Sequence, residues 1–422
     1  MIFLALIFLW SIVSRALERT VITAPMFFTV AGLLTFLLPP WLSAVDLDRK
    51  TFLLIAEIGL VLTLFTDADH INLQLLKGDR NLPVRLLSIG MLLTIVLGAL
   101  GALVVVGGLT FWEAGILAAI LAPTDAGLGH VIVSSPRVPR YIRQGLSMEA
   151  GLNDGLSVPF LMAFIALALE TTEGAGAVLT RFLWEQLGYG TIIGLGIGLA
   201  GGWLLGLAQR RNWMAEGSQQ LGLVTLPLLC VMGSEVTGAS MFIAAYLAGL
   251  VVQIGFPKAG ERSAEFAENW GRLFNFFVFY LFGLLVARAR MSFNAPLVLY
   301  AVLSLTVVRM IPVALALAGT GLSRATVLFA GWFGPRGLVS IVLGLVYLEE
   351  QANLPGESTI RLAVMATVLL SILAHGLSAS PGIALYRRAI ASLESGALEY
   401  QSLDGTAVSR RGRDSSLENL AK

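Results

Sequence analysis

The stretch LAPTDAGLG, residues 121–129, decides the fold because it interrupts an apolar segment long enough to cross a membrane. Pro123 removes a backbone donor and breaks a helix, and two glycines follow Asp125. We therefore predict that the helix over 111–134 unwinds near the middle of the bilayer and leaves free carbonyls beside a carboxylate. Non-helical backbone at that depth is tolerated only where it lines a cavity or is buried in protein. The alternative is an ordinary proline kink with a buried, hydrogen-bonded Asp125.

A second interrupted segment lies in the other half of the chain. WFGPRGLVS, residues 332–340, places Pro335 between glycines inside the apolar range 324–348. The number of intervening spans makes this segment run in the opposite direction to the one over 111–134. Two broken helices of opposite direction are typical of inverted-repeat transporters, whose binding site lies at the midplane. The two breaks therefore predict an all-α polytopic membrane protein in which the broken helices cross in the middle of the bilayer.

The composition places the chain in a membrane. Of 422 residues, 56% are hydrophobic and 13% are charged, against roughly 25% charged in soluble domains. The mean hydropathy is +0.82, and 45 glycines suit close packing of helices in lipid. A net charge of +1 with dispersed basic residues gives no indication of a nucleic-acid partner. Because Cys230 is the single cysteine, an internal disulfide and a cysteine metal site are excluded, and we expect no cofactor.

Apolar ranges of about 20 residues predict about thirteen membrane-spanning helices. The predicted spans are 1–14, 21–42, 51–66, 83–108, 111–134, 145–169, 187–209, 218–233, 238–256, 271–287, 294–318, 324–348 and 361–378. Basic residues favour cytoplasmic loops, and their distribution predicts an external N-terminus and a cytoplasmic C-terminus. The polar residues 384–422 are predicted to form a disordered cytoplasmic tail, with a short regulatory helix near IASLESGALEYQSL, residues 390–403, as the alternative. Short loops favour a bacterial inner membrane as the location.

The motif EAGLNDG, residues 149–155, brings two acids and an amide into the predicted span over 145–169. Charges at that depth are functional by default, and pairing inside the helix bundle is the plainer alternative. Glu149 and Asn153 share one face of the helix, whereas Asp154 points about 100° away from Asn153. Glu149 needs a buried arginine as its partner. A desolvated carboxylate such as Asp154 binds either a proton or a small cation, which is the chemistry of proton-coupled exchange. Alternatively, Asp154 serves helix packing.

Three short motifs follow one another on the predicted spans: PTDA at 123–126, EAGLNDG at 149–155 and GPRGLVS at 334–340. Together they resemble NhaP-type cation:proton antiporters, the group that includes the eukaryotic sodium/proton exchangers. EIGLVLTLFTDA at 57–68 and ITAPMFFTVAGLL at 22–34 are similar to earlier helices of that family. The resemblance extends over almost the whole membrane region.

The resemblance implies thirteen helices divided into a core domain and a domain that forms a homodimer. The core would comprise 83–169 and 294–378. The interface helices would lie within 1–82 and 218–287, and the helix over 187–209 would link the two domains.

The resemblance also implies which residues bind the ions. The family's cation- and proton-binding positions match Thr124, Asp125, Asn153 and Asp154, and the two aspartates would be transient ligands of a monovalent cation. The helix breaks match Pro123 and Pro335. In the family, the acid that opens the EAGLNDG motif pairs with the arginine of the second break. This implies a structural ion pair between Glu149 and Arg336.

Three further residues carry expectations of their own. Ala150 stands where the family often has serine, so the ion site lacks one hydroxyl ligand, which a water molecule or Thr124 would have to replace. Arg309 falls near the middle of a predicted span. We expect it to have a structural role, either pairing with a buried acid such as Glu57 or extending toward the membrane surface. His375 is expected to be an ordinary interfacial histidine, with pH sensing as the alternative.

The expected function is antiport of Na⁺, or of Li⁺ or K⁺, against H⁺ across a membrane by alternating access, and not an enzyme activity. In the family, an Asn-Asp pair on this helix implies electroneutral exchange, because one titratable group carries either one proton or one monovalent cation. Two other functions are compatible with charged residues inside membrane spans. A cation channel would conduct without proton coupling, but the sequence has no repeated filter motif. Carboxylates in the middle of a span would also suit a membrane aspartyl hydrolase, but no Gly-x-Gly-Asp motif lies near the acids, and the sequence has no HExxH or Gly-x-Ser-x-Gly motif.

Overall fold

The protein is described from a computed structural model. The structure describes residues 1–17, 20–39, 49–69, 81–169, 183–257, 264–349, 354–393 and 397–400. Within these ranges the regular structure is helical, which confirms the prediction of an all-α fold. Eight of the described helices are long and apolar enough to cross a membrane, and shorter apolar helices accompany them. The total of thirteen spans stays a prediction.

Every range predicted to span the membrane coincides with a helix or with a pair of consecutive helices. Predicted spans that contain a break or an irregular turn appear as two elements. In chain order the helices are α1 Ile2–Leu17, α2 Ala24–Thr35, α4 Arg49–Asp69, α5 Asn81–Arg85, α6 Met91–Val105, α7 Phe111–Ile120, α8 Ala126–Val133, α9 Arg140–Ala168, α11 Gly190–Arg210, α12 Glu216–Thr237, α13 Met241–Gly255, α14 Ala264–Ala289, α15 Ala295–Leu305, α16 Val307–Ala316, α17 Arg324–Trp332, α18 Leu338–Glu349 and α19 Glu357–Ile390.

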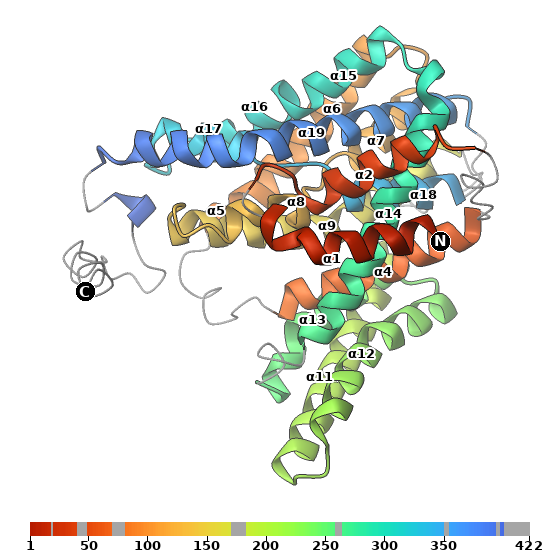
Figure 1. Cartoon of the computed structure of the whole chain (residues 1–422), viewed down its shortest axis with the longest axis vertical. Coiled ribbons are helices and arrows are strands. Elements are labelled where there is room, and N and C mark those ends of the chain that lie inside the picture. Colours follow the sequence, from red (N-terminus) through yellow and green to blue (C-terminus); the bar gives the residue numbers. More distant parts are fainter. Residues whose placement is uncertain are drawn as a thin grey trace.

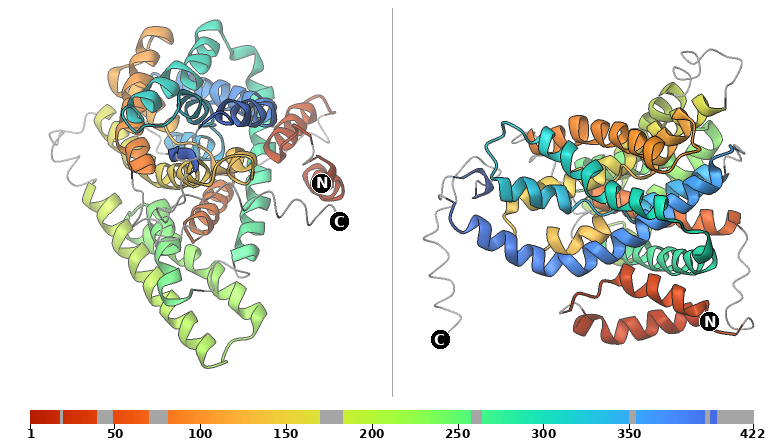
Figure 2. Two further views of the ribbon diagram at one scale, coloured as in Figure 1. Left: turned by 90° about the vertical axis from the view of Figure 1, so that its left-hand side faces the viewer. Right: turned by 90° about the horizontal axis from the view of Figure 1, so that it is seen from above.

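One group of helices forms around α4, α13 and α14. Helix α11 packs along α13, both α13 and α14 pack against α4, and α14 also packs on α2. The α11–α13 contact depends on glycines spaced four residues apart, because a Cβ at Gly194 or Gly202 would collide with the backbone of α13. The far ends of α11 and α12 project away from the remaining helices (Figure 1), whereas α1 and α2 lie at the edge beside α14 (Figure 2).

A second group of helices contains the two interrupted spans. Helix α6 packs on α7 and α15, α7 packs on α9, and α15 and α17 pack on α19. The short helices α8 and α18 lie inside this group and contact both α9 and α19. Helix α4 connects the two groups, because it also contacts α9 and α18. The interrupted spans are therefore surrounded by protein, as unwound backbone at membrane depth requires.

The region after the last predicted span differs from the expectation of a disordered tail beginning at residue 384. Helix α19 continues to Ile390, and a 3₁₀ turn follows at Leu398–Tyr400. The helix continues because apolar residues still recur on its buried face, where Ile383, Tyr386 and Ile390 are buried. Residues 401–422 lie outside the described part of the chain.

Candidate functional site

The two predicted helix breaks are present and meet each other. Helix α7 ends at Ile120 and α8 begins at Ala126, while α17 ends at Trp332 and α18 begins at Leu338. Pro123 and Pro335 lie in these gaps, as predicted. The backbone N–H of Asp125 donates to the carbonyl of Pro335 at 2.8 Å, so one extended segment crosses directly over the other.

Asp125 joins the starts of two half-helices. Its Oδ1 accepts hydrogen bonds from the backbone N–H groups of Gly127 at 2.7 Å and Leu128 at 3.1 Å, and its Oδ2 accepts one from Leu338 at 2.5 Å. The N-termini of α8 and α18 carry partial positive charge, which a buried carboxylate offsets. Gly337 approaches this carboxylate so closely that a Cβ there would collide with Oδ2. Asp125 therefore fixes the crossing, a role that the sequence did not reveal.

Arg336 provides the opposite charge at the end of α7. Its guanidinium is fully buried, and Nη1 donates to the carbonyls of Ala122 and of Pro123, the latter at 2.8 Å. Carbonyls that follow a helix C-terminus carry partial negative charge, which a cation offsets. The backbone N–H of Arg336 donates to Ser371 Oγ on α19 at 2.7 Å. The crossing is thus held by an anion at the N-termini of two half-helices and a cation beyond the C-terminus of a third.

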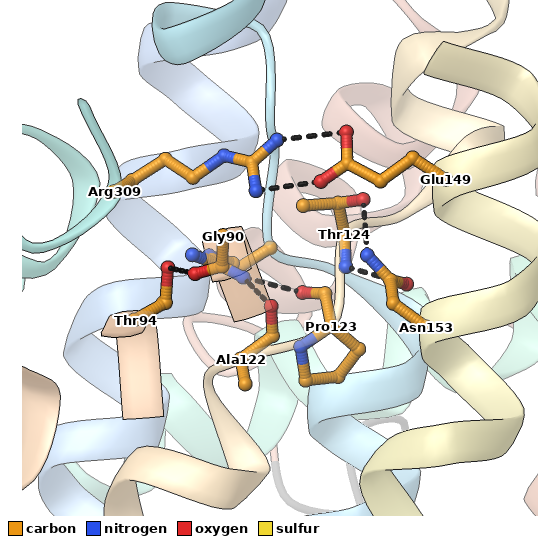
Figure 3. Close-up of polar contacts among 9 residues, drawn as sticks. Gly90, Thr94, Ala122, Pro123, Thr124, Glu149, Asn153 and Arg309 are labelled. Carbon is orange, nitrogen blue, oxygen red and sulfur yellow. Dashed lines mark hydrogen bonds and ion pairs between the residues drawn. The ribbon is translucent and has the colours of Figure 1, made fainter. Parts of the chain in front are cut away.

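The expected ion pair between Glu149 and Arg336 is wrong. Glu149 pairs with Arg309 on α16, with Nη1–Oε1 at 2.7 Å and Nη2–Oε2 at 3.0 Å, in the two-pronged geometry of a strong arginine–carboxylate pair. Both residues are 2% exposed. In Figure 3 the pair lies above Thr124 and Asn153. Arg336 instead donates to the carbonyls beyond α7. Arg309 therefore has the structural role that was expected, but its partner is Glu149 and not Glu57.

Thr124 and Asn153 tie the first break to α9. The backbone N–H of Thr124 donates to Asn153 Oδ1 at 3.2 Å, and Asn153 Nδ2 donates to Thr124 Oγ1 at 2.9 Å (Figure 3). These reciprocal bonds satisfy a donor that the broken helix would leave free. They also fix the amide orientation and bring two predicted site residues into direct contact.

Asp154 is a buried carboxylate whose hydrogen bonding is incomplete, as is that of the Arg336 guanidinium, whose Nε and Nη2 have no partner among the described residues. It is 4% exposed, and its Oδ1 has no hydrogen-bond partner among the described residues. Two further carboxylates, Asp125 and Asp67, act on it electrostatically. A buried carboxylate without a donor or cation is strongly disfavoured, so the oxygen is available to a proton or a small cation. Ser157 Oγ binds the Asp154 backbone carbonyl and not the carboxylate.

A small cavity opens beside the crossing. Its volume of about 20 Å³ has room for about one water molecule. The lining residues are Thr124, Asp125, Gly129, Ile132, Val133, Leu146, Glu149, Ala150, Phe333 and Pro335. It therefore joins the break after α7, the first half of α9 and the break after α17. Ala150, the position where the family often has serine, lies at its wall.

Residues on α19 and α13 complete this region in roles that the sequence did not predict, and His375 is buried rather than interfacial. His375 Nε2 lies 2.8 Å from the Trp332 carbonyl, and Nδ1 lies 3.2 Å from Ser371 Oγ, the acceptor of the Arg336 N–H. This histidine thus connects both sides of the second break, and its ring stacks on Trp332. Tyr246 on α13 has a buried hydroxyl without a partner among the described residues, near Asp154. Neither residue lies in a motif.

Comparison with known proteins agrees with this architecture. A family model described as "Sodium/hydrogen exchanger, transmembrane" matches residues 2–384. The chain is 26% identical over 365 residues to the K(+)/H(+) antiporter NhaP of Alkalimonas amylolytica, covering 84% of this chain and 61% of that protein. It is 27% identical over 285 residues to Na(+)/H(+) antiporter 2 of Zygosaccharomyces rouxii, covering 62% and 34%. The chain thus spans less than two thirds of each of these relatives.

A solved structure shares the fold. The sodium proton antiporter MjNhaP1 from Methanocaldococcus jannaschii, at pH 8, superposes with a TM-score of 0.74 at 20% identity, covering 91% of this chain and 97% of that one. At this identity the likeness establishes the fold. The family match covers nearly the whole membrane region and includes both crossing segments. The chain belongs to the sodium/hydrogen exchanger family.

Proposed function

We propose that this protein is a secondary antiporter that exchanges one Na⁺, or one Li⁺ or K⁺, for one H⁺ across the membrane. The observation that carries the proposal is Asp154, a buried carboxylate with an oxygen that no described residue satisfies. Family membership and the names of similar proteins support antiport as the activity. The proton and the cation compete for this carboxylate, and each leaves the same net charge in the site.

The other predicted site residues supply oxygen atoms, the ligand type that hard cations prefer. Thr124 Oγ1 accepts one hydrogen bond and retains a lone pair, and Asn153 Oδ1 likewise accepts one. Asp125 Oδ2 accepts a single bond, so it can also contribute to a cation ligand set. Because Asp125 is already compensated by three backbone donors, Asp154 is the group whose charge the transported ion must balance.

Exchange requires the site to face one side of the membrane at a time. We place the cavity at the crossing on the cytoplasmic side, because it includes Ile132 and Val133 near the predicted inner end of the first broken span. At the opposite end, mainly apolar side chains from α4, α14, α18 and α19 line a cavity of about 40 Å³ between the two helix groups. We propose that the group with the crossing is the core, and that it moves against the other group, which forms a homodimer.

We also propose in which membrane the protein lies and on which side its termini are. An excess of Lys and Arg in one set of predicted loops supports a cytoplasmic C-terminus and an external N-terminus. We infer an inner, or plasma, membrane of a bacterium. The proposed partners are the transported ions, the lipid bilayer and a second copy of the chain.

The proposal is tested in vesicles that contain the protein, carry a preset proton gradient and contain a pH-sensitive dye. Na⁺, Li⁺ and K⁺ are added in turn, and the responding cation identifies the substrate. One-for-one exchange predicts that an imposed membrane potential changes neither the rate nor the direction of flux. Cation flux without proton movement would instead indicate a channel, and a gradient driven by voltage would contradict one-for-one exchange.

Replacing Ala150 with serine is expected to strengthen cation binding. The side chain lines the cavity beside the crossing, so the added hydroxyl can supply the ligand oxygen that this chain lacks. One additional hydrogen-bond-strength contact corresponds to a decrease of about threefold or more in the apparent KM for the cation. Initial exchange rates across a concentration series measure the effect, with Ala150→Gly as the matched control. An unchanged KM for the serine variant would show that position 150 does not reach the ion.

A further inference from the structure

The chain segment that follows α19 returns to the start of α17. Glu399, in the 3₁₀ turn Leu398–Tyr400, is 2% exposed. Its Oε1 accepts hydrogen bonds from the Ser323 backbone N–H and from Thr326 Oγ1, both at 2.8 Å. Ser323 is the N-cap of α17, and its own Oγ accepts the Thr326 N–H at 3.2 Å. We call Glu399, Ser323 and Thr326 the Glu399 clamp.

The clamp places a carboxylate where the helix favours an anion. The N-terminal N–H groups of α17 have no partners within the helix, and the positive end of the helix dipole lies there. Glu399 satisfies one of these donors, and Ser323 Oγ satisfies another. The contact joins residues more than seventy positions apart, so it is a tertiary attachment and not a local turn.

Two further contacts hold this region together. The Tyr400 hydroxyl donates to the Ile390 carbonyl at 2.7 Å, which fastens the segment to the end of α19. Tyr386 on α19 stacks on Phe329 of α17, with ring centroids 4.1 Å apart, and its hydroxyl lies 2.9 Å from Thr326 Oγ1. Helix α17 is therefore attached at its first turn by the clamp and along its length by α19.

Helix α17 connects the Glu399 clamp to the crossing at the ion site. It has 9 residues and is thus about 13 Å long, a short rigid element. It ends at Trp332, whose carbonyl meets His375, and the chain then enters the crossing that contains Arg336. A shift at the first turn of α17 therefore moves the crossing segment against Asp125.

We infer that Glu399 is a positioning residue for ion binding, which acts through α17 on the crossing. The inference rests on the proposed antiport function. It means that a segment outside the membrane spans tunes the affinity of a site near the middle of the bilayer.

The clamp is expected to stay closed over the pH range of cells. Burial disfavours the charged carboxylate, but hydrogen bonds from Ser323 and Thr326 outweigh it and hold the pKa of Glu399 below its usual value. Tyr386 on α19 is a titratable group that interacts electrostatically with Glu399. Its stabilising contribution is present above the ordinary carboxylate pKa and is lost only as the pH falls through the lowered value. Releasing the clamp should therefore change affinity and leave the pH profile of exchange in place.

The test compares two substitutions and two chain ends by initial exchange rates over a range of cation concentrations. Glu399→Ala and a chain ending after Leu393 remove the clamp, whereas Glu399→Gln and a chain ending after Gln401 retain the accepting oxygen. We expect the first two to raise the apparent KM at least about threefold with a similar maximal rate, and the last two to stay within about twofold of the wild type. The substitution Ala397→Cys, made in a Cys230→Ser background, places one thiol in this segment. The rate at which a thiol reagent labels it reports whether the segment has detached.

Each outcome decides the inference. Detachment of the segment in Glu399→Ala with an unchanged KM overturns it. If Glu399→Ala yields too little folded protein, Thr326→Val removes one bond of the clamp and must raise the KM in the same direction, and no change overturns it. If the wild type shows no cation-linked proton flux, the proposed antiport function fails. In that case, cation affinity is measured from the rise in the melting temperature of the purified protein with cation concentration. Equal affinities in the wild type and in Glu399→Ala would overturn the inference.

Discussion

Replacing Asp154 with asparagine is expected to abolish cation-driven proton flux. The amide has nearly the same shape but can neither take up a proton nor balance the charge of a cation. Loss of a charge-assisted interaction in a buried site, together with loss of the proton carrier, predicts a decrease in rate of about a hundredfold or more. The measurement is the initial rate at which a responding cation dissipates a preset proton gradient, with protein content matched between vesicles.

Glu268→Gln is the matched control for this substitution. It makes the same change from acid to amide, but on an exposed residue whose side chain pairs with Arg272 along α14, so exchange should stay at the wild-type rate. The melting temperature of Asp154→Asn should not fall, because the substitution removes an unsatisfied buried carboxylate oxygen. Exchange that persists in Asp154→Asn would show that this residue serves packing alone.

Replacing Glu149 with glutamine is expected to destabilise the protein strongly. The substitution leaves the Arg309 guanidinium buried without its anion, and breaking one side of a buried pair costs about 3–5 kcal/mol. Exchange should fall together with the amount of folded protein, because the pair lies beside the crossing. The measurement is thermal unfolding of the purified protein in detergent.

The double variant Glu149→Gln with Arg309→Met separates pairing from packing. Methionine fills part of the space of the arginine without a charge, and replacing both partners of a buried pair is often neutral. The double variant should therefore recover most of the stability lost in Glu149→Gln alone. A double variant that unfolds as early as the single one would show that the ion pair is not what stabilises this region.

The sequence predicts the breaks well because their cause is local. Pro123 and Pro335 each remove a backbone donor, and the glycines close by favour unwinding. Proline alone does not decide the break, because Pro159 and Pro381 lie inside continuous helices. The membrane spans are predicted from equally local information. A run of apolar residues long enough to cross the bilayer can be recognised without knowing which helices it packs against. The contact of Thr124 with Asn153 also follows, because the resemblance already placed both residues in one site.

The partners of the buried charges could not be predicted in the same way. Two arginines, Arg309 and Arg336, were available to Glu149, and the choice depends on which guanidinium the chain brings to α9. The carbonyls beyond α7 engage Arg336, so Arg309 is left for the acid. Arg336 does not pair with the acid because unwound backbone competes for it, and that competition has no sequence signal.

Residues that act through backbone atoms are also invisible to motif analysis. His375 contacts a carbonyl of the second break, and Glu399 contacts an N–H at the start of α17. Both come from a helix or turn far away in the sequence, where nothing marks them as functional. The segment containing Glu399 was predicted to be disordered on composition, yet a single buried carboxylate attaches it to the helices.

The central claim is that a proton and a cation compete for Asp154. The most direct test measures initial exchange rates against cation concentration at a series of pH values on the side where the cation is added. Competition predicts that, below the pH at which the site loses its proton, each unit of acidification raises the apparent KM about tenfold and leaves the maximal rate unchanged at saturating cation. A KM that stays constant while the maximal rate falls with acidification would contradict it, because the proton would then act somewhere other than the cation site.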